Sequence, residues 1–207
     1  MKTKYIFILA WSLFIPACQD GQLVEEELPS GLLVKYHVDQ ETGEKEGEYL
    51  LMTPEGEIIE KSHYVKGQLQ GQRTIYTDSG TVEMVQLYDA GMLEGEYKGY
   101  YPSGELKYEG TYVNNKMKGV WTYYYESGAI KEKVAFEDNL ENGPFEEYDP
   151  DGTLRAKGHY LEGDNEHGIL YLYSEEGEPQ RVMDCKMGVC ITQWTPDSTE
   201  VNFNDFQ

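Results

Sequence analysis

Apolar and polar residues alternate along short segments of this chain, and glycine-containing turns separate the segments. Leu106, Tyr108 and Tyr112 fall on one side of an extended strand, and charged residues occupy the positions between them. Ile130, Val134 and Phe136 repeat the pattern one segment later. A period of two is typical of a strand with one buried and one solvated side. Glycine about every 10 residues argues against helices.

Two series of glycines show that the chain is repetitive. The first series has spacings of 24, 24, 24, 24 and 25 residues, and the second follows it nine residues behind with the same spacings. The first series is Gly47, Gly71, Gly95, Gly119, Gly143 and Gly168; the second is Gly56, Gly80, Gly104, Gly128, Gly152 and Gly177. Residues 47–190 are therefore about six copies of one unit.

Each copy is predicted to be one β-hairpin. Tight-turn tetrads such as Pro54-Glu-Gly-Glu57 and Pro102-Ser-Gly-Glu105 precede segments rich in Tyr, Val, Ile and Thr, as strands require. If the first glycine is position 1, a second turn site, usually Gly or Asn, falls at position 21. In the first strand, apolar residues at positions 3, 5 and 6 break the alternation, which indicates a bulge.

The segment Tyr112-Val-Asn-Asn-Lys-Met-Lys-Gly119-Val-Trp121-Thr-Tyr-Tyr-Tyr-Glu-Ser-Gly128 resembles the MORN-repeat variant family. That family has a Tyr, an Asn or Gly turn, Lys, Gly-x-Trp and paired Tyr before an Asn/Ser-Gly turn. Members are often named YwqK-type antitoxins. Copy two departs from the pattern, with Arg73 where Trp or Tyr is expected. The resemblance implies an all-β, elongated, single-layer antiparallel meander of about six 24-residue hairpins, and it implies binding rather than catalysis.

The ends of such an array need caps. Residues 31–46 are predicted to hold an N-terminal capping strand, because Val34, Tyr36 and Val38 alternate with polar residues. Residues 191–207, with Trp194 and Phe203, are predicted to form the C-terminal cap.

Residues 1–17 are interpreted as a signal peptide, because a basic start precedes the 11-residue apolar run Tyr5–Ile15, which is too short to span a bilayer. The run ends in Ile15-Pro-Ala-Cys18, which resembles a bacterial lipobox and implies lipidation of Cys18. The alternative is ordinary secretory cleavage near Ala17, leaving Cys18 as a free thiol. Residues 18–30 are expected to form a flexible acidic tether, which loosely resembles export signals of Bacteroidota surface lipoproteins. The expected location is the cell envelope, with the protein anchored to the outer membrane on its periplasmic or surface-facing side.

The formal net charge of −21 over 207 residues makes two classes of binding partner less favourable. It opposes sequence-independent nucleic-acid binding and adhesion to anionic lipid. Aromatic residues make up 13%, which argues against a disordered acidic tail.

Two cysteines near the end of the array, Cys185 and Cys190, are separated by a hairpin-sized turn. Facing each other across that turn, they would lie at bridging distance, and a location outside the cytoplasm favours a disulfide. The alternative is two buried thiols. No further metal ligands lie nearby in the sequence, so we expect no zinc site.

An aromatic patch is the sharpest candidate for a binding site. Tyr101 and Tyr125 replace the small or polar residues of the other copies, and Trp121 and Tyr123 lie close by. If the preceding residue of each copy, at position 6, points inward, then Tyr101 and Tyr125 point outward and the patch is exposed. The alternative is that the ribbon twists and buries both faces.

The sequence thus predicts a non-enzymatic, membrane-anchored scaffold that binds a protein partner, which the acidic composition predicts to be basic. A glycan-binding surface at the tyrosine patch is the alternative. We expect no catalytic residue, no cofactor and no metal.

Overall fold

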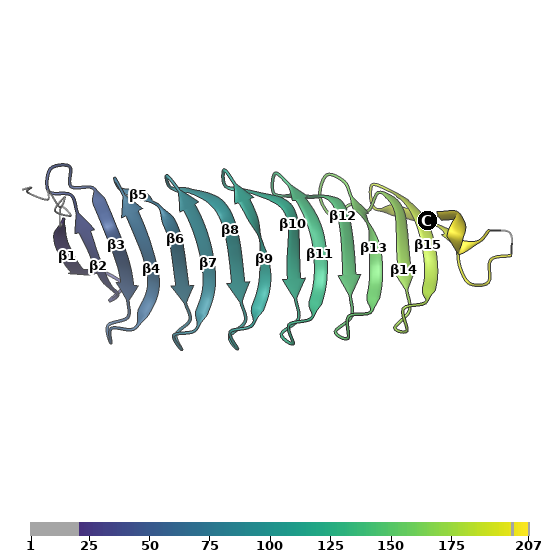
Figure 1. Cartoon of the computed structure of the whole chain (residues 1–207), viewed down its shortest axis with the longest axis horizontal. Helices are drawn as coiled ribbons and strands as arrows, with labels where there is room; N and C mark the ends of the chain where they lie inside the picture. Colours follow the sequence, from purple (N-terminus) through teal and green to yellow (C-terminus); the bar gives the residue numbers. More distant parts are fainter. Residues whose placement is uncertain (1–20, 200, 207) are drawn as a thin grey trace, which may run out of the picture.

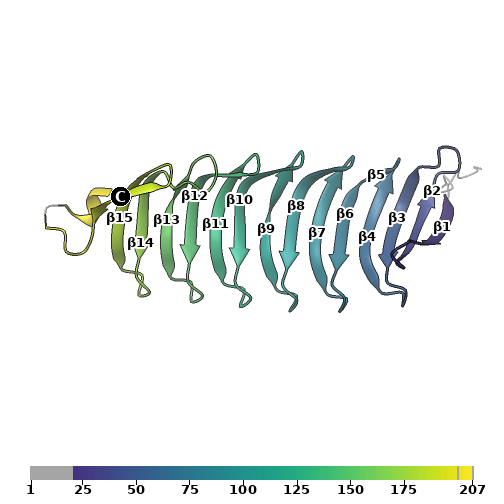
Figure 2. The same cartoon turned by 180° about the vertical axis from the view of Figure 1, so that it is seen from behind.

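The computed structural model of the protein describes residues 21–199 and 201–206, and these form a single open β-sheet. Its 16 strands stand side by side along the long axis of the molecule, with the earliest strands at one end and the latest at the other (Figure 1). The view from behind shows the same single row (Figure 2). The predicted all-β, single-layer antiparallel meander is confirmed.

The strands follow one another in chain order. They are β1 Gln22–Glu27, β2 Leu33–Val38, β3 Lys45–Met52, β4 Ile58–Val65, β5 Gln68–Leu69, β6 Gly71–Tyr76, β7 Val82–Asp89, β8 Met92–Tyr100, β9 Leu106–Val113, β10 Lys116–Tyr124, β11 Ile130–Glu137, β12 Leu140–Tyr148, β13 Leu154–Tyr160, β14 Gly168–Tyr173, β15 Pro179–Lys186 and β16 Val189–Trp194. Every pair is antiparallel, and only the short β5 lies off the main path, paired with β4. With neighbours about 4.8 Å apart, the fifteen strands of the main path span roughly 67 Å.

Two classes of turn line the two long edges of the sheet (Figure 1). On one edge the second-series glycines close the tetrads: Gly104, with φ of 90°, donates its N–H to the carbonyl of Tyr101, and Tyr101 donates to Glu105. On the other edge both central residues have positive φ, as at Asn114 (50°) and Asn115 (63°). This is the type I′ geometry that matches the twist of a hairpin.

Bulges interrupt the first strands without changing which side each residue faces. Between β9 and β10, Lys118 pairs with Thr111 and Thr122 pairs with Glu109, so three residues of β10 face only Gly110. Gly119, with φ of 72°, lies in this bulge. Because the bulge adds two residues to β10, the alternation of sides continues through it: positions 3 and 5 share one side of the sheet, and position 6 points to the other side.

The N-terminal end of the sheet differs from the prediction. Gln22–Glu27, expected within a flexible tether, forms β1 and pairs along its whole length with β2. An edge strand needs only one backbone ladder, and here an ion pair of 2.7 Å between Glu25 and Lys35 adds to it. Because β1 lies outside β2, residues 31–46 do not form the outermost strand. The three consecutive glutamates of β1 oppose pairing with another sheet.

The C-terminal end folds back over one face. After β16, a short 3₁₀ helix, Phe203–Phe206, brings the ring of Phe203 to 5.3 Å from Trp194 and 6.0 Å from Tyr171 (centroid distances). The hydroxyl of Tyr171 donates to the carbonyl of Phe206. Beneath this segment Val182 has no exposed surface.

The predicted signal peptide and Cys18 lie outside the described residues, so cleavage and lipidation stay predictions. Within residues 21–199 and 201–206, no helix combines the length and hydropathy that a membrane span requires.

Candidate functional site

One face of the sheet, which we call the aromatic face, carries the rings at positions 3 and 18 of the central copies. Its buried residues include Trp121, Phe136 and Phe145, and half-buried tyrosines pack around them. Trp121 and Phe136 belong to a ring network with centroid distances of 5.0 to 6.4 Å, which also includes Tyr97, Tyr108, Tyr112 and Tyr123. Beside it, Phe145 stacks on Tyr160 with a centroid distance of 4.1 Å.

Two glycines outside the periodic series make room for this network. A Cβ added to Gly110 would overlap the indole of Trp121, and one added to Gly99 would overlap the ring of Tyr108. Periodicity alone did not single out these glycines. They could have been found in the sequence as glycines placed opposite aromatic residues of the neighbouring strand.

The predicted aromatic patch is wrong for Trp121, which is only 2% exposed. Position 3 points into the aromatic face, and Tyr123 at position 5, on the same side of the strand, packs beside it. The companion assumption, that position 6 points inward, is also wrong. Tyr124 lies on the opposite, polar face, where its hydroxyl donates to Glu109 at 2.7 Å.

Tyr101 and Tyr125 connect neighbouring copies. Their hydroxyls donate to the backbone carbonyls of Tyr124 and Tyr148, each at 2.7 Å. Both side chains are half-buried, and Lys107 lies over the ring of Tyr101 at 5.6 Å from its centroid. The structure therefore brings the predicted patch residues into one region of the sheet, but it separates a buried indole from two tyrosines at the turn edge.

Charged side chains cover the polar face. Lys133 pairs with Glu146 across β11 and β12 at 3.7 Å, and Lys98 pairs with Glu96 at 2.7 Å. Such exposed pairs contribute little stability individually. However, these pairs neutralise lysines, so the unpaired charges that remain are mainly carboxylates, as the 38 acidic and 17 basic residues of the sequence indicate.

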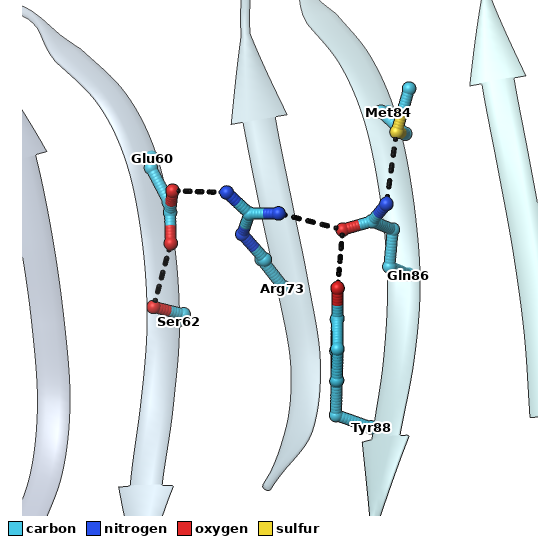
Figure 3. Close-up of polar contacts among 6 residues, drawn as sticks. All are labelled: Glu60, Ser62, Arg73, Met84, Gln86 and Tyr88. Atoms are coloured by element: carbon cyan, nitrogen blue, oxygen red, sulfur yellow. Dashed lines mark hydrogen bonds and ion pairs between the residues drawn. The ribbon is translucent and has the colours of Figure 1, made fainter. Parts of the chain in front are cut away.

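A polar network replaces the aromatic cluster in copy two (Figure 3). Arg73, at position 3, donates to Glu60 at 2.6 Å and to Gln86 at 3.1 Å. Glu60 also accepts from Ser62, and Gln86 accepts from Tyr88. The hydrogen bond to Glu60 raises the pKa of Arg73, which therefore stays charged. Arg73 was visible in the sequence as a departure from the repeat, but its partners were not.

A surface pocket of about 230 Å³ lies at the turn edge beside Tyr125. Its lining combines both charges: Tyr125, Lys131, Glu132, Glu147, Tyr148 and Arg155. Glu132 and Glu147 are directly opposite each other in β11 and β12. Burial, and then the charge of Glu147, raise the pKa of Glu132. Arg155 reaches Glu147 at 3.1 Å.

Cys185 and Cys190 pair directly across the last hairpin, with their Sγ atoms bonded and their Cα atoms 3.9 Å apart. Within the described part of the chain, no group of three or more His, Cys, Asp or Glu side chains has the arrangement of a metal site.

Taken together, these features define the class of protein: an open repeat array with one aromatic and one charged face. The family model described as the MORN repeat variant matches residues 93–114, 117–138 and 141–162. Residues 93–162 thus carry three tandem MORN-variant repeats, and each match spans two strands that the structure pairs as one hairpin.

No curated protein matches the chain. Among solved structures, it is similar to a porin-like protein from Bacteroides uniformis ATCC 8492, at 10% identity over 81% of this chain and 91% of the other. The TM-score is 0.22, which is too low to indicate a shared fold.

Proposed function

We propose that the protein is a non-enzymatic scaffold whose aromatic face binds a protein partner. The observation that carries the proposal is the absence of a second layer: within residues 21–199 and 201–206 there is one sheet and one 3₁₀ helix. A sheet with an apolar face normally buries it against another element. Here tyrosines such as Tyr108 and Tyr123 remain half-exposed. Exposed aromatic surface of this kind is enriched at protein interfaces.

The partner is proposed to be basic. The chain carries 38 acidic and 17 basic residues, and much of the basic set is already paired within the sheet. A complementary surface on the partner speeds encounter and suppresses acidic competitors. By family resemblance the partner is a toxin, and an adjacent gene for a small basic protein would support that narrower reading.

We also propose that Cys18 is lipidated and anchors the array to a membrane of the cell envelope. The lipobox-like sequence supports this, and β1 begins only four residues later. An extended spacer of that length reaches roughly 14 Å. The first strand would then lie close to the bilayer. Radiolabelled palmitate incorporation that disappears in Cys18→Ser would support the anchor, and unchanged labelling would refute it.

A pull-down from envelope extract tests partner binding. The wild-type chain is compared with Tyr108→Ser/Tyr123→Ser on the aromatic face and with the control Tyr124→Ser/Tyr148→Ser on the polar face. We expect one basic protein to be retained by the wild type and the control, lost with the aromatic-face variant, and weakened by salt. Equal retention by all three, or no retention at any salt concentration, would contradict the proposal.

Glycan binding is the second candidate, and the pocket beside Tyr125 favours it. The pocket offers a tyrosine ring, carboxylates and cations, which suit a polar ligand. Retention on a panel of immobilised polysaccharides should be lost in Tyr101→Ala/Tyr125→Ala with unchanged folding. Equal retention would eliminate this candidate.

A further inference from the structure

Three tyrosines at the N-terminal end of the aromatic face surround one ammonium group. The Nζ of Lys45 lies 4.9 Å from the ring centroid of Tyr36, 4.6 Å from that of Tyr49 and 5.1 Å from that of Tyr64. The rings come from three adjacent strands, β2, β3 and β4, and Tyr36 and Tyr49 are directly paired. Neighbouring rings are 6.0 and 5.6 Å apart. All three distances to Nζ are within the range of a cation–π contact.

Lys45 occupies a position that is apolar in the next three copies. The residue two places before the first glycine is Leu69, Leu93 or Met117 in copies two to four. Met117 packs against the core cluster in its own copy. A lysine at this position of copy one therefore places a cation where the repeat otherwise places a hydrocarbon group.

The cage suits an ammonium that carries no N–H groups. A lysine ammonium has three donors and is strongly hydrated. Yet within the described chain the Nζ of Lys45 has no hydrogen bond or ion pair, and it lies over three ring faces. A quaternary ammonium needs no acceptor and gains the same attraction from the rings. Cages of aromatic rings are how proteins recognise choline and methylated lysine.

We infer that Tyr36, Tyr49 and Tyr64 form a binding site for a quaternary ammonium group and that Lys45 is its internal, displaceable occupant. The long side chain of Lys45 can turn out to solvent without moving the strand. One unneutralised carboxylate lies at the cage: Glu26 accepts from the Tyr36 hydroxyl at 3.3 Å, whereas Glu60, whose charge also acts on Tyr49 and Tyr64, is paired with Arg73. The carboxylate of Glu26 repels a phosphate. The site therefore favours a trimethyllysine side chain over a phosphocholine headgroup.

Titration calorimetry with the full-length chain tests the inference, using choline as the first probe. An internal occupant lowers the apparent affinity for choline in proportion to the fraction of molecules whose cage is open. Lys45→Ala is thus expected to bind choline at least about fivefold more tightly than the wild type. Lys45→Leu is the matched variant: it removes the same charge but fills the cage with a hydrocarbon side chain, so it should bind no choline.

Further measurements test whether binding depends on the positive charge of the ligand and on the rings of the cage. The neutral choline isostere 3,3-dimethylbutan-1-ol should not bind to Lys45→Ala, and Lys61→Ala, on the polar face of the same hairpin, should bind choline as the wild type does. Tyr49→Phe in the Lys45→Ala background should retain binding and Tyr49→Leu should lose it, with folding checked by circular dichroism. Trimethyllysine binding more tightly than phosphocholine supports the inferred source, and the reverse order overturns it. Equal choline affinity of the Ala and Leu variants, or equal binding of the isostere, overturns the site itself. None of these results depends on the protein partner proposed above.

Discussion

The Arg73–Glu60 pair offers the most direct test of how copy two is held together. Arg73 and Glu60 have side chains that are 26% and 12% exposed, and their closest atoms are 2.6 Å apart. Replacing Arg73 with Met keeps much of the volume but leaves the carboxylate of Glu60 with Ser62 as its remaining side-chain partner.

The expected loss of stability lies between two reference cases. Breaking a fully buried ion pair costs about 3–5 kcal/mol, whereas an exposed pair contributes about 0–1 kcal/mol. Since this pair is partly buried, we expect Arg73→Met to lower the free energy of unfolding by about 2 kcal/mol. The double variant Arg73→Met/Glu60→Leu removes both charges, and its stability should return to within about 1 kcal/mol of the wild type.

Urea denaturation of the four members of this double-mutant cycle gives the coupling energy. A repeat array can unfold in parts, so hydrogen exchange in β4, β6 and β7 should accompany the equilibrium curves. A loss below about 0.5 kcal/mol for Arg73→Met would show that the pair is energetically a surface pair. Purely additive effects in the cycle would refute the claim that Arg73 and Glu60 stabilise each other.

Three other predictions follow from the geometry. Gly110→Ala should displace the indole of Trp121 and cost about 1–3 kcal/mol, measured by urea denaturation together with a change in tryptophan fluorescence. Glu132→Gln should stabilise the protein by about 0.5 kcal/mol at pH 7, because it removes a charge opposite Glu147. The pKa of Glu132 is raised in the folded state. The gain should therefore vanish as the pH falls below about 4, where the carboxyl becomes protonated in both the folded and the unfolded state. A gain that persists at about pH 3, well below the unfolded pKa of a glutamate, would contradict that explanation. Cys190→Ser opens the five-residue disulfide loop and should lower the stability of the last hairpin by about 2 kcal/mol, seen as faster hydrogen exchange in β15 and β16; unchanged exchange would indicate that the bond does not stabilise this hairpin.

The repeat and its hairpins could be predicted because their determinants are local. A turn that needs positive φ at one residue accepts few residue types, so Gly56 and its counterparts recur at fixed spacing. The alternating second strands gave the antiparallel meander in the same way. Type I′ turns were less visible, because Lys66, Ala90 and Met187 occupy a left-handed position at which asparagine, as at Asn114, is the typical residue.

The faces could not be predicted, because the first strands carry aromatic residues on both sides. Trp121 and Tyr123 lie on the aromatic face, whereas Tyr124 lies on the polar face, where its hydroxyl binds Glu109. Aromatic residues at positions 3, 5 and 6 therefore do not indicate which side of the strand is buried. Similarly, β1 is held by backbone pairing with β2, so its acidic sequence resembles a tether although it forms a strand.

The contrast between conserved turns and varied faces bears on function. The turn positions repeat from copy to copy, since each must satisfy the same backbone geometry. The residues at position 3 do not repeat: they are Tyr49, Arg73, Tyr97, Trp121, Phe145 and Leu170. An array that needed only to be stable could use one aromatic residue throughout, since neighbour contacts are equivalent along a repeat. The variation instead makes each section of the aromatic face chemically distinct, with a caged ammonium at one end, a partly buried ion pair beside it and stacked rings in the centre. We therefore expect the proposed partner to bind in one register rather than slide along the sheet, because each pair of strands presents a different group at a fixed spacing of about 10 Å.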